Sequence, residues 1–448
     1  MKKHRIVIAP ANTDLNRGDQ ALVWETAQIL KDSYEEADIT LISYGNSEKE
    51  KYLQTRQSEL KGFKFIDPII PHPSRFFNEK LNNKIFKSIV WTFVSIGDII
   101  PRLMILSKIT IIKKIGNVLL TKKEREIINN YLEFDTIAYK GGGFIHSYGK
   151  ISDIYVFIYQ LYYVIFAKRF NKKVVFLPNS FGPFKNKVAK KIYKIIMNKV
   201  DLITVREKIS ENQNNNILKN KSYFYPDLGF YIKKNEDFNF NDYLTQNKLQ
   251  KNNHYKNIGI TVRPYNFSGH KDTKKLYEKY IKSISEFIKN FQKEYNFYLI
   301  AQTMGPSNHE NDHLAINAVQ NNLDKKVNVI SDLELNANDL VSIYSEMDYV
   351  IGTRFHSVIF SFTQQIPCIA ISYGGNKGEG IMKNFSLEDY EIKIDEINEK
   401  DLIEMFKRLI KDKNVTKNIS VKLEEYISER EKLILKIKKA LGENQNEN

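Results

Sequence analysis

The stretch Gly352-Thr353-Arg354-Phe355-His356-Ser357 is bracketed by two apolar runs. Residues 348–351 before it read as a buried strand, 358–363 after it as a helix, and 368–372 as the next strand. Strand, tight turn, helix and returning strand form the repeating unit of parallel α/β sheets. Helix N-termini attract anions, and an arginine there adds a bidentate fork for phosphate or carboxylate. The stretch therefore predicts an anion-binding turn at a strand end.

The same alternation of apolar strands and amphipathic helices runs along nearly the whole chain of 448 residues. That length is too great for one ordinary core, so we expect an α/β protein with two Rossmann-like domains facing a cleft. The first domain is expected over 1–232, with a basic, apolar insert at 61–120, and the second over 258–400. The polar stretch 233–257 reads as a linker, and 401–441 as C-terminal helices that could pack across both domains.

The composition narrows the classes of partner. The chain has 68 Lys and Arg against 53 Asp and Glu, a net charge of +15, which suits nucleic acid, anionic membrane or phosphorylated substrates. The chain carries no zinc spacing, aromatic RNA-binding signature or basic-zipper pattern, so we predict no nucleic-acid role. Its single cysteine, Cys368, lies in a predicted buried strand, which excludes an internal disulfide and fits a reducing cytoplasm.

The insert leaves two interpretations open. No stretch is long and uninterrupted enough to read as a membrane span, since residues 85–120 are apolar but broken by Asp98, Pro101 and several basic residues. A basic, apolar helix of this kind could lie on an anionic membrane surface, which would make the protein cytoplasmic and peripheral at the inner face of the membrane. The alternative is a packing helix or a lid over the cleft.

Charged residues follow the predicted strands of the second domain, where doubly wound sheets bind ligands. Arg263 comes directly after the strand 258–262. With Arg354 it would supply two forks for a substrate that carries both a carboxylate and a phosphate. His356 is the candidate acid–base group, because the field at a helix start disfavours its imidazolium form.

A glycine-rich loop at 374–380 follows the next strand and contains Gly375 and Lys377. Its backbone N–H groups could cradle an anion, with Lys377 as a point charge, although a hairpin tip would have the same composition. Gln302 follows another predicted strand, 297–301. His309 and His313 have the spacing of a metal-binding pair, but the metalloprotease glutamate is lacking, so we predict no metal site.

In the first domain, Asn16 and Asp19 lie between the first strand and its helix. Asp19 could cap that helix or form a hydrogen bond with a sugar hydroxyl. Gly142 and Gly143 belong to a predicted turn at 141–143, which would either admit a ligand close to the backbone or serve only the turn. Ser180 lies in a predicted loop, 178–184, after the strand 173–177.

In their order along the chain, these motifs resemble the polysaccharide pyruvyl transferase family. The Arg354-Phe355-His356 triplet, followed by Pro367, a strand, Tyr373 and Lys377, is the most specific portion. The other matching motifs are Asn16-x-Gly18-Asp19, Gly141-Gly142-Gly143-Phe144, Ser180-Phe181-Gly182-Pro183-Phe184, Arg206, Pro226-Asp227 and Gly259-Ile260-x-x-Arg263.

The resemblance implies a fold like that of glycosyltransferase-B enzymes, with phosphoenolpyruvate as the donor and no cofactor or metal. The acceptor would be a sugar in a cell-surface polysaccharide or a lipid-linked oligosaccharide, and the product a pyruvate ketal on two hydroxyls, with phosphate released. It assigns catalysis to Arg263, Arg354 and His356. From their positions along the chain, we expect donor binding by Lys377, Gly375, Thr353 and Gln302, and acceptor binding by Asn16, Asp19, Gly142, Gly143 and Ser180. Asp19, Asp227 and Glu379 are the candidates for protonating the donor methylene.

Two rival functions remain. A glycosyltransferase of the same architecture would take a nucleotide sugar and use a carboxylate, such as Glu334 or Glu379, for the ribose. A non-catalytic partner in glycan assembly would be held to the membrane by the insert, but the presence of Arg263, Arg354 and His356 argues against it.

Overall fold

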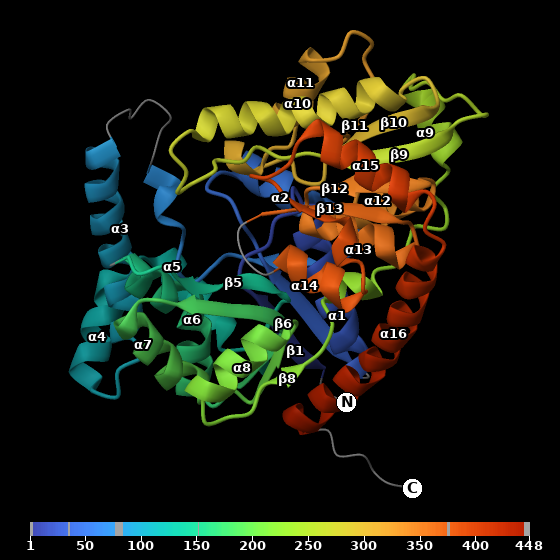
Figure 1. The fold of residues 1–448 in the computed structure, drawn as a ribbon. Coiled ribbons are helices and arrows are strands. Elements are labelled where there is room, and N and C mark those ends of the chain that lie inside the picture. The colour runs from blue at the N-terminus through green and yellow to red at the C-terminus, as the bar shows by residue number, and fades with distance from the viewer. Residues whose placement is uncertain (1–2, 35, 77–83, 151, 374–376, 443–448) are drawn as a thin grey trace, which may run out of the picture. The chain divides into compact units, whose positions relative to one another are not determined.

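The computed structural model describes residues 3–34, 36–76, 84–150, 152–373 and 377–442 (Figure 1). The chain divides into two compact units. Unit 1 comprises Met1–Asp14, Leu22–Asp227 and Glu431–Asn448, and unit 2 comprises Leu15–Ala21 and Leu228–Arg430. The first domain was expected to hold the whole N-terminal region, but the segment Leu15–Ala21 belongs to unit 2.

Unit 1 is built on a parallel sheet with the order β3-β2-β1-β4-β6-β7-β8, in which β5 also pairs with β6. Ile137, Val174 and Phe176 are fully buried in these strands, as expected for a sheet covered by helices on its faces. The strands are β1 (His4–Ala9), β2 (Ala37–Ile42), β3 (Lys64–Ile66), β4 (Thr136–Tyr139), β5 (Gly142–Ser147), β6 (Lys173–Phe184), β7 (Leu202–Val205) and β8 (Tyr223–Phe224).

The helices of unit 1 connect these parallel strands, and several begin at side-chain caps. Thr121 and Glu124 form a capping box at the start of α5, and Asn186 caps α7 through two backbone N–H groups. The helices are α1 (Arg17–Ser33), α2 (Glu48–Leu60), α3 (Lys84–Met104), α4 (Thr110–Leu119), α5 (Lys122–Tyr131), α6 (Ser152–Arg169), α7 (Lys187–Met197) and α8 (Lys208–Ile217), with a 3-10 helix, η1 (Pro73–Phe76).

The expected turn at 141–143 and the expected loop at 178–184 are instead paired strands. Strand β5 starts at Gly142, which pairs with Asn179, and β6 runs through both prolines to Phe184. The predictions were wrong because proline and glycine were read as loop signals. Here β5 supplies backbone partners along the second half of β6, with two register irregularities that accommodate those residues.

Unit 2 contains a second parallel sheet with the order β11-β10-β9-β12-β13-β14 (Figure 1). Its central strands β9 and β12 are buried except at Lys256, the first residue of β9, and Ile258, Ile260 and Ile351 are completely enclosed. The strands are β9 (Lys256–Thr261), β10 (Tyr295–Ile300), β11 (Asn328–Ile330), β12 (Tyr349–Gly352), β13 (Cys368–Ser372) and β14 (Glu391–Lys393). Both sheets agree with the expected Rossmann-like architecture.

The expected linker at 233–257 is partly a packed element of unit 2. Phe240, Tyr243 and Leu244 on α9 are buried in its core, because their spacing of three and four places them on one helix face. The helices of unit 2 are α9 (Phe240–Gln246), α10 (Thr273–Phe291), α11 (His313–Asn321), α12 (Ala337–Ser345), α13 (Phe355–Thr363), α14 (Lys377–Asn384) and α15 (Glu399–Leu409), with 3-10 helices η2 (Leu228–Tyr231), η3 (Asn308–Glu310) and η4 (Glu388–Tyr390).

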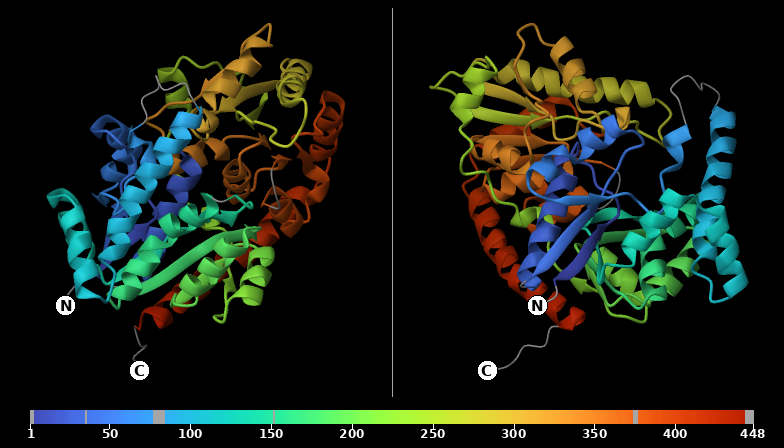
Figure 2. Two further views of the ribbon diagram at one scale, coloured as in Figure 1. Left: turned by 90° about the vertical axis from the view of Figure 1, so that its left-hand side faces the viewer. Right: turned by 180° about the vertical axis from the view of Figure 1, so that it is seen from behind.

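The C-terminal helix α16 (Asn414–Leu441) is continuous, and its residues up to Arg430 belong to unit 2 while those from Glu431 belong to unit 1. The insert folds mainly as α3 and α4, which adjoin each other within unit 1 (Figures 1 and 2). Among the described residues, none of the helices combines the length and the apolar character needed to cross a bilayer.

Candidate functional site

The turn between β12 and α13 places Thr353 and Arg354 at the carboxyl end of the unit 2 sheet. Gly352 pairs with Thr261 on β9, and the Thr261 hydroxyl accepts hydrogen bonds from the N–H groups of Thr353 (3.0 Å) and Arg354 (3.3 Å). A Cβ atom at Gly352 would lie 2.7 Å from the Ser357 Oγ, so the turn requires glycine there. The first turn of α13 is thereby fixed at a strand end, where anions and ligands bind.

Arg354 is buried and held by an acidic partner. It donates from Nε (2.9 Å) and Nη2 (2.5 Å) to Asp312, whose other oxygen accepts from the backbone N–H groups of Gln302 and Thr303. Burial acts to lower the pKa of Arg354, but its interactions with Asp312, Tyr373 and Glu310 together outweigh burial, so the pKa is raised and the side chain stays cationic. The fork of Arg354 is therefore fixed in position before any ligand binds.

Glu310 brings Arg263 and Arg354 together. Its Oε2 accepts from Arg354 Nη1 at 2.9 Å, and its Oε1 lies 3.7 Å from Arg263 Nη2. Arg263 also stacks on the ring of Tyr373, with 4.3 Å between the guanidinium carbon and the ring centroid. The Tyr280 hydroxyl accepts from the Arg263 N–H (3.3 Å) and forms a hydrogen bond with Thr353 (3.1 Å), which links the two strand ends. One carboxylate thus already sits between two arginines.

His356 occupies the first turn of α13 and packs against Gly18. A Cβ atom built at Gly18 would lie only 2.2 Å from His356 Nδ1, so the backbone of this glycine forms a wall of the imidazole site. The ring of His356 is half-buried and makes an edge contact with Phe355, 5.3 Å between centroids. A half-buried imidazole in the helix turn that follows Arg354 could exchange a proton with a bound anionic substrate.

Asn16 and Asp19 lie in unit 2, in the same segment as Gly18. Asn16 Oδ1 accepts from the N–H groups of Gly18 (3.1 Å) and Asp19 (3.2 Å), which makes it the N-cap of α1. Asn16 also forms an antiparallel bridge with Thr303. These two residues were expected with the acceptor residues of the first domain, but the structure groups them with the arginines and His356.

The remaining residues predicted for the donor fall into two groups. Thr353 and Gln302 are both buried, and Gln302 Oε1 accepts from the Tyr344 hydroxyl at 3.0 Å, so these two side chains support the turn from within. Gly375 lies outside the described residues. Lys377 begins α14, and its side chain is not part of the description.

In unit 1, the structure brings Gly142, Gly143 and Ser180 together at the pairing of β5 with β6. Ser180 Oγ accepts from Arg206 Nε at 2.8 Å, and Arg206 also pairs with Asp227. All three of these polar side chains are buried. The ion pair of Arg206 with Asp227 thereby holds the hydrogen-bond partner of Ser180 in place.

Glu310 and Asp312 were missed as site residues. The signal in this part of the sequence was the metal-like spacing of His309 and His313 on either side of them. Among the described residues, no cluster of three or more His, Cys, Asp or Glu side chains is arranged to hold a metal ion. Instead, Asp312 is completely buried and serves Arg354, while Glu310 is 39% exposed and faces both arginines.

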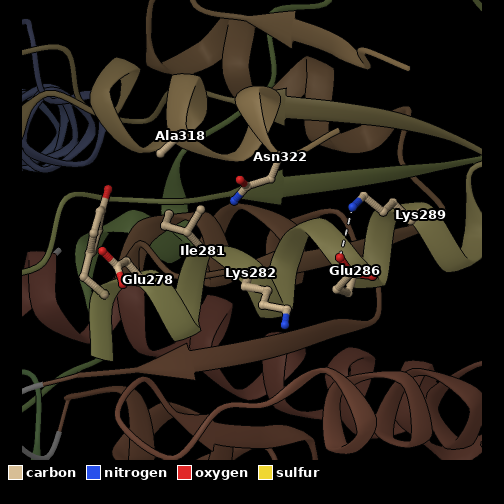
Figure 3. Close-up of a pocket in the computed structure, with 8 residues that line it drawn as sticks. Glu278, Ile281, Lys282, Glu286, Lys289, Ala318 and Asn322 are labelled. Atoms are coloured by element: carbon tan, nitrogen blue, oxygen red, sulfur yellow. Dashed lines mark hydrogen bonds and ion pairs between the residues drawn. The ribbon is translucent and has the colours of Figure 1, made fainter. Parts of the chain in front are cut away.

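A surface groove of about 430 Å³ lies between α10 and α11, and none of its lining residues belongs to the arginine cluster (Figure 3). Its charged residues are of both signs, and Lys289 pairs with Glu286 at 3.0 Å. Glu278 and Lys282 also line it. Because these charges alternate rather than converge on one sign, the groove is a weaker candidate for an anionic ligand than the arginine cluster.

Solved structures of similar fold identify the architecture. A putative UDP-N-acetylglucosamine 2-epimerase from Listeria monocytogenes superposes with a TM-score of 0.54 and 10% identity, over 93% of this chain and 91% of that chain. A UGT from Glycyrrhiza uralensis, complexed with glycyrrhetinic acid 3-O-monoglucuronide, gives 0.56 and 9%, over 98% and 96%. The protein therefore has two parallel-sheet α/β domains of the glycosyltransferase-B type, and at such low identities these likenesses show the fold alone.

The protein family is identified from the amino-acid sequence. The profile of the family described as polysaccharide pyruvyl transferase matches residues 16–375, which is most of the chain. The chain belongs to this family, and its class is that of transferases acting on a sugar in a polysaccharide.

Proposed function

We propose that the protein transfers the pyruvyl group of phosphoenolpyruvate to two hydroxyls of one sugar, forming a pyruvate ketal and releasing phosphate. The observation that carries this proposal is the pair of guanidinium groups, Arg263 and Arg354, that hold one carboxylate between them, with His356 two residues after Arg354 in the first turn of α13. A small donor with a carboxylate and a phosphate needs two such forks within a few ångströms of an acid–base group.

The reaction balances without any redox step. Protonation of the donor methylene makes C2 electrophilic, and the first sugar hydroxyl attacks C2 and loses its proton. The C–O bond to phosphate then breaks, phosphate leaves with its electron pair, and the second hydroxyl adds to C2 and loses its proton. Two protons leave the hydroxyls, one ends on the methyl group and one on phosphate, so the proposal requires neither a redox cofactor nor a metal.

Each residue of the cluster has a role in this scheme. Arg354, fixed by Asp312, and Arg263, stacked on Tyr373, would bind the carboxylate and phosphate and stabilise the charge that develops on the leaving group. His356 would take the proton of the attacking hydroxyl. Glu310 would have to give up its place between the arginines when the donor binds.

The carboxylate that protonates the methylene is best sought in unit 2. Asp227 is buried in unit 1 and paired with Arg206, which leaves it poorly placed to give up a proton. Asp19 follows Gly18, whose backbone contacts His356, and Glu310 contacts both arginines. We assign Asp19 as one candidate and Glu310 as the other, the latter only once the donor has displaced it from the arginines and it has taken up a proton. The side chain of the third predicted candidate, Glu379, lies outside the described residues.

The acceptor in this proposal is a sugar of a cell-surface polysaccharide or of its lipid-linked oligosaccharide precursor. Gly142, Gly143 and Ser180 of unit 1 are the residues proposed to contact it, because the pairing of β5 with β6 places them close together. The corresponding location is cytoplasmic, at the inner face of the cell membrane.

The test is phosphate release from phosphoenolpyruvate with a panel of oligosaccharide and lipid-linked acceptors. Release should depend on the acceptor and should fall about 100-fold or more in His356→Ala, the loss typical of a missing acid–base group. The exposed His254 provides the control, since His254→Ala leaves the cluster intact. Preferential binding of a nucleotide sugar over phosphoenolpyruvate would overturn the proposal and favour a glycosyltransferase.

A further inference from the structure

The outer surface of α3 and α4 in unit 1 is strongly apolar. On α3, the exposed apolar residues recur at a spacing of three and four, so they form one stripe along the helix. Residues on α4 continue with the same spacing, and all of these side chains are between 46% and 81% exposed. We call this surface the α3–α4 face: Phe86, Ile89, Phe93, Ile96 and Ile100 on α3, and Ile111, Ile115, Val118 and Leu119 on α4.

The opposite side of the two helices is well packed, so the exposure does not come from a loose segment. Arg102 is completely buried, donates to the Ile69 carbonyl at 2.6 Å and pairs with Glu124 at 2.5 Å. Gly116 on α4 approaches α3 so closely that a Cβ atom there would lie 2.8 Å from the Met104 Cβ. The α3–α4 face is therefore held outward by a fixed scaffold.

The charges around this face have one sign. Asp98 is the only acidic residue in the sequence from 84 to 119, and it is buried and paired with Arg75. Lys108, Lys113 and Lys114 are exposed within the same segment. Within 84–119, the apolar stripe is thus accompanied by exposed lysines and by no exposed carboxylate, which makes it complementary to a layer with an apolar interior and an anionic surface.

We propose that the α3–α4 face docks the protein on the surface of an anionic lipid bilayer. The phenylalanine and isoleucine side chains would enter the boundary between headgroups and acyl chains, and the lysines would contact lipid phosphates. A second copy of the chain fits this face poorly, because a two-fold interface would bring the two sets of lysines together. The inference goes beyond the proposed function, since it holds whatever group the protein transfers.

The test is flotation of the full-length protein with vesicles of phosphatidylglycerol and phosphatidylcholine, compared with vesicles of phosphatidylcholine alone. The wild type should float with the anionic vesicles, and less so as salt is raised. The variant Phe93→Ser/Ile111→Ser/Val118→Ser should lose at least about tenfold in vesicle affinity, because three inserting side chains are removed. Lys113→Gln/Lys114→Gln should weaken binding and reduce its dependence on salt.

The control variant is Val421→Ser/Ile427→Ser on α16, where both side chains are 61% exposed; it should float like the wild type. The proposal is overturned if the triple variant still floats like the wild type, or if the wild type binds neutral vesicles equally well. It is also overturned if the wild type ignores vesicles but forms a dimer that the triple variant cannot form. Phosphate release with a water-soluble acceptor should be unchanged in the triple variant, which separates this test from that of the reaction.

Discussion

Replacing Glu310 with glutamine is expected to tighten binding of phosphoenolpyruvate, because the carboxylate competes with the donor for the arginines. Glu310 lies 2.9 Å from Arg354 Nη1 and 3.7 Å from Arg263 Nη2, and it is 39% exposed. An ion pair in so open a position contributes at most about 1 kcal/mol. Losing both contacts should therefore lower the Kd for the donor by about 5- to 30-fold, which corresponds to ~1–2 kcal/mol.

The measurement is calorimetric titration with phosphoenolpyruvate in the absence of acceptor, so that binding is seen without turnover. Glu286→Gln is the matched control, because Glu286 also belongs to unit 2, also pairs with a cation (Lys289, 3.0 Å) and has a similar exposure of 37%. The Kd of this control should equal that of the wild type. The gain in Glu310→Gln should shrink as salt is added, because the competition is between charges.

A Kd that rises in Glu310→Gln would refute the competition argument. It would mean that Glu310 orients the arginines for the donor and does not exclude it. Acceptor-dependent phosphate release by the same variant decides whether Glu310 also takes part in the reaction. If Glu310→Gln binds the donor more tightly but its acceptor-dependent phosphate release falls, then Glu310 and not Asp19 is the residue that protonates the methylene.

Three further results are expected. Gly18→Ala should lower kcat by about tenfold or more with little loss of stability, because its Cβ would displace the ring of His356, whereas Gly97→Ala, with open space around it, should leave kcat unchanged. Phe240→Ala should lower the free energy of unfolding by about 3–5 kcal/mol in denaturant titrations if α9 is part of the core. Burial acts to raise the pKa of Asp67, but the neighbouring lysines outweigh burial and lower this pKa. The ionised carboxylate therefore stabilises the folded protein at neutral pH, and this contribution to the free energy of unfolding should be lost as the pH falls below 3.8. In Asp67→Asn, denaturant titrations should show that this contribution is absent at every pH.

The elements of the fold could be predicted where hydrophobic periodicity is strong. The strand before Gly352, the turn and α13 follow from the apolar runs on either side, and Arg263 and Arg354 follow from the rule that ligands bind at strand ends. Periodicity fails in polar segments. The seven residues of α9 were read as linker because asparagine and lysine surround the few apolar positions that bury.

The partners within the site could not be predicted, because they depend on contacts between distant residues. Asp312 and Arg354 are 42 residues apart, and the segment between β10 and α11 has no periodic pattern that would point either acid at an arginine. The only local signal was that two carboxylates alternate with histidines in that segment, which suggests a metal rather than an ion pair. Nothing in the sequence around Asn16 shows that it contacts Thr303.

The segment Leu15–Ala21 brings the N-terminal motif of the family into contact with residues of unit 2, among them His356 of the Arg-x-His motif. Arg17 donates its N–H to the Gln302 carbonyl at 3.0 Å, the Gln20 Oε1 accepts from the Ala337 N–H at 2.7 Å, and Gly18 supports His356. These contacts fix the first turn of α1 within unit 2 although the rest of the helix belongs to unit 1. The N-terminal motif, where the family match begins, and the Arg-x-His motif therefore contribute to the same cluster within unit 2.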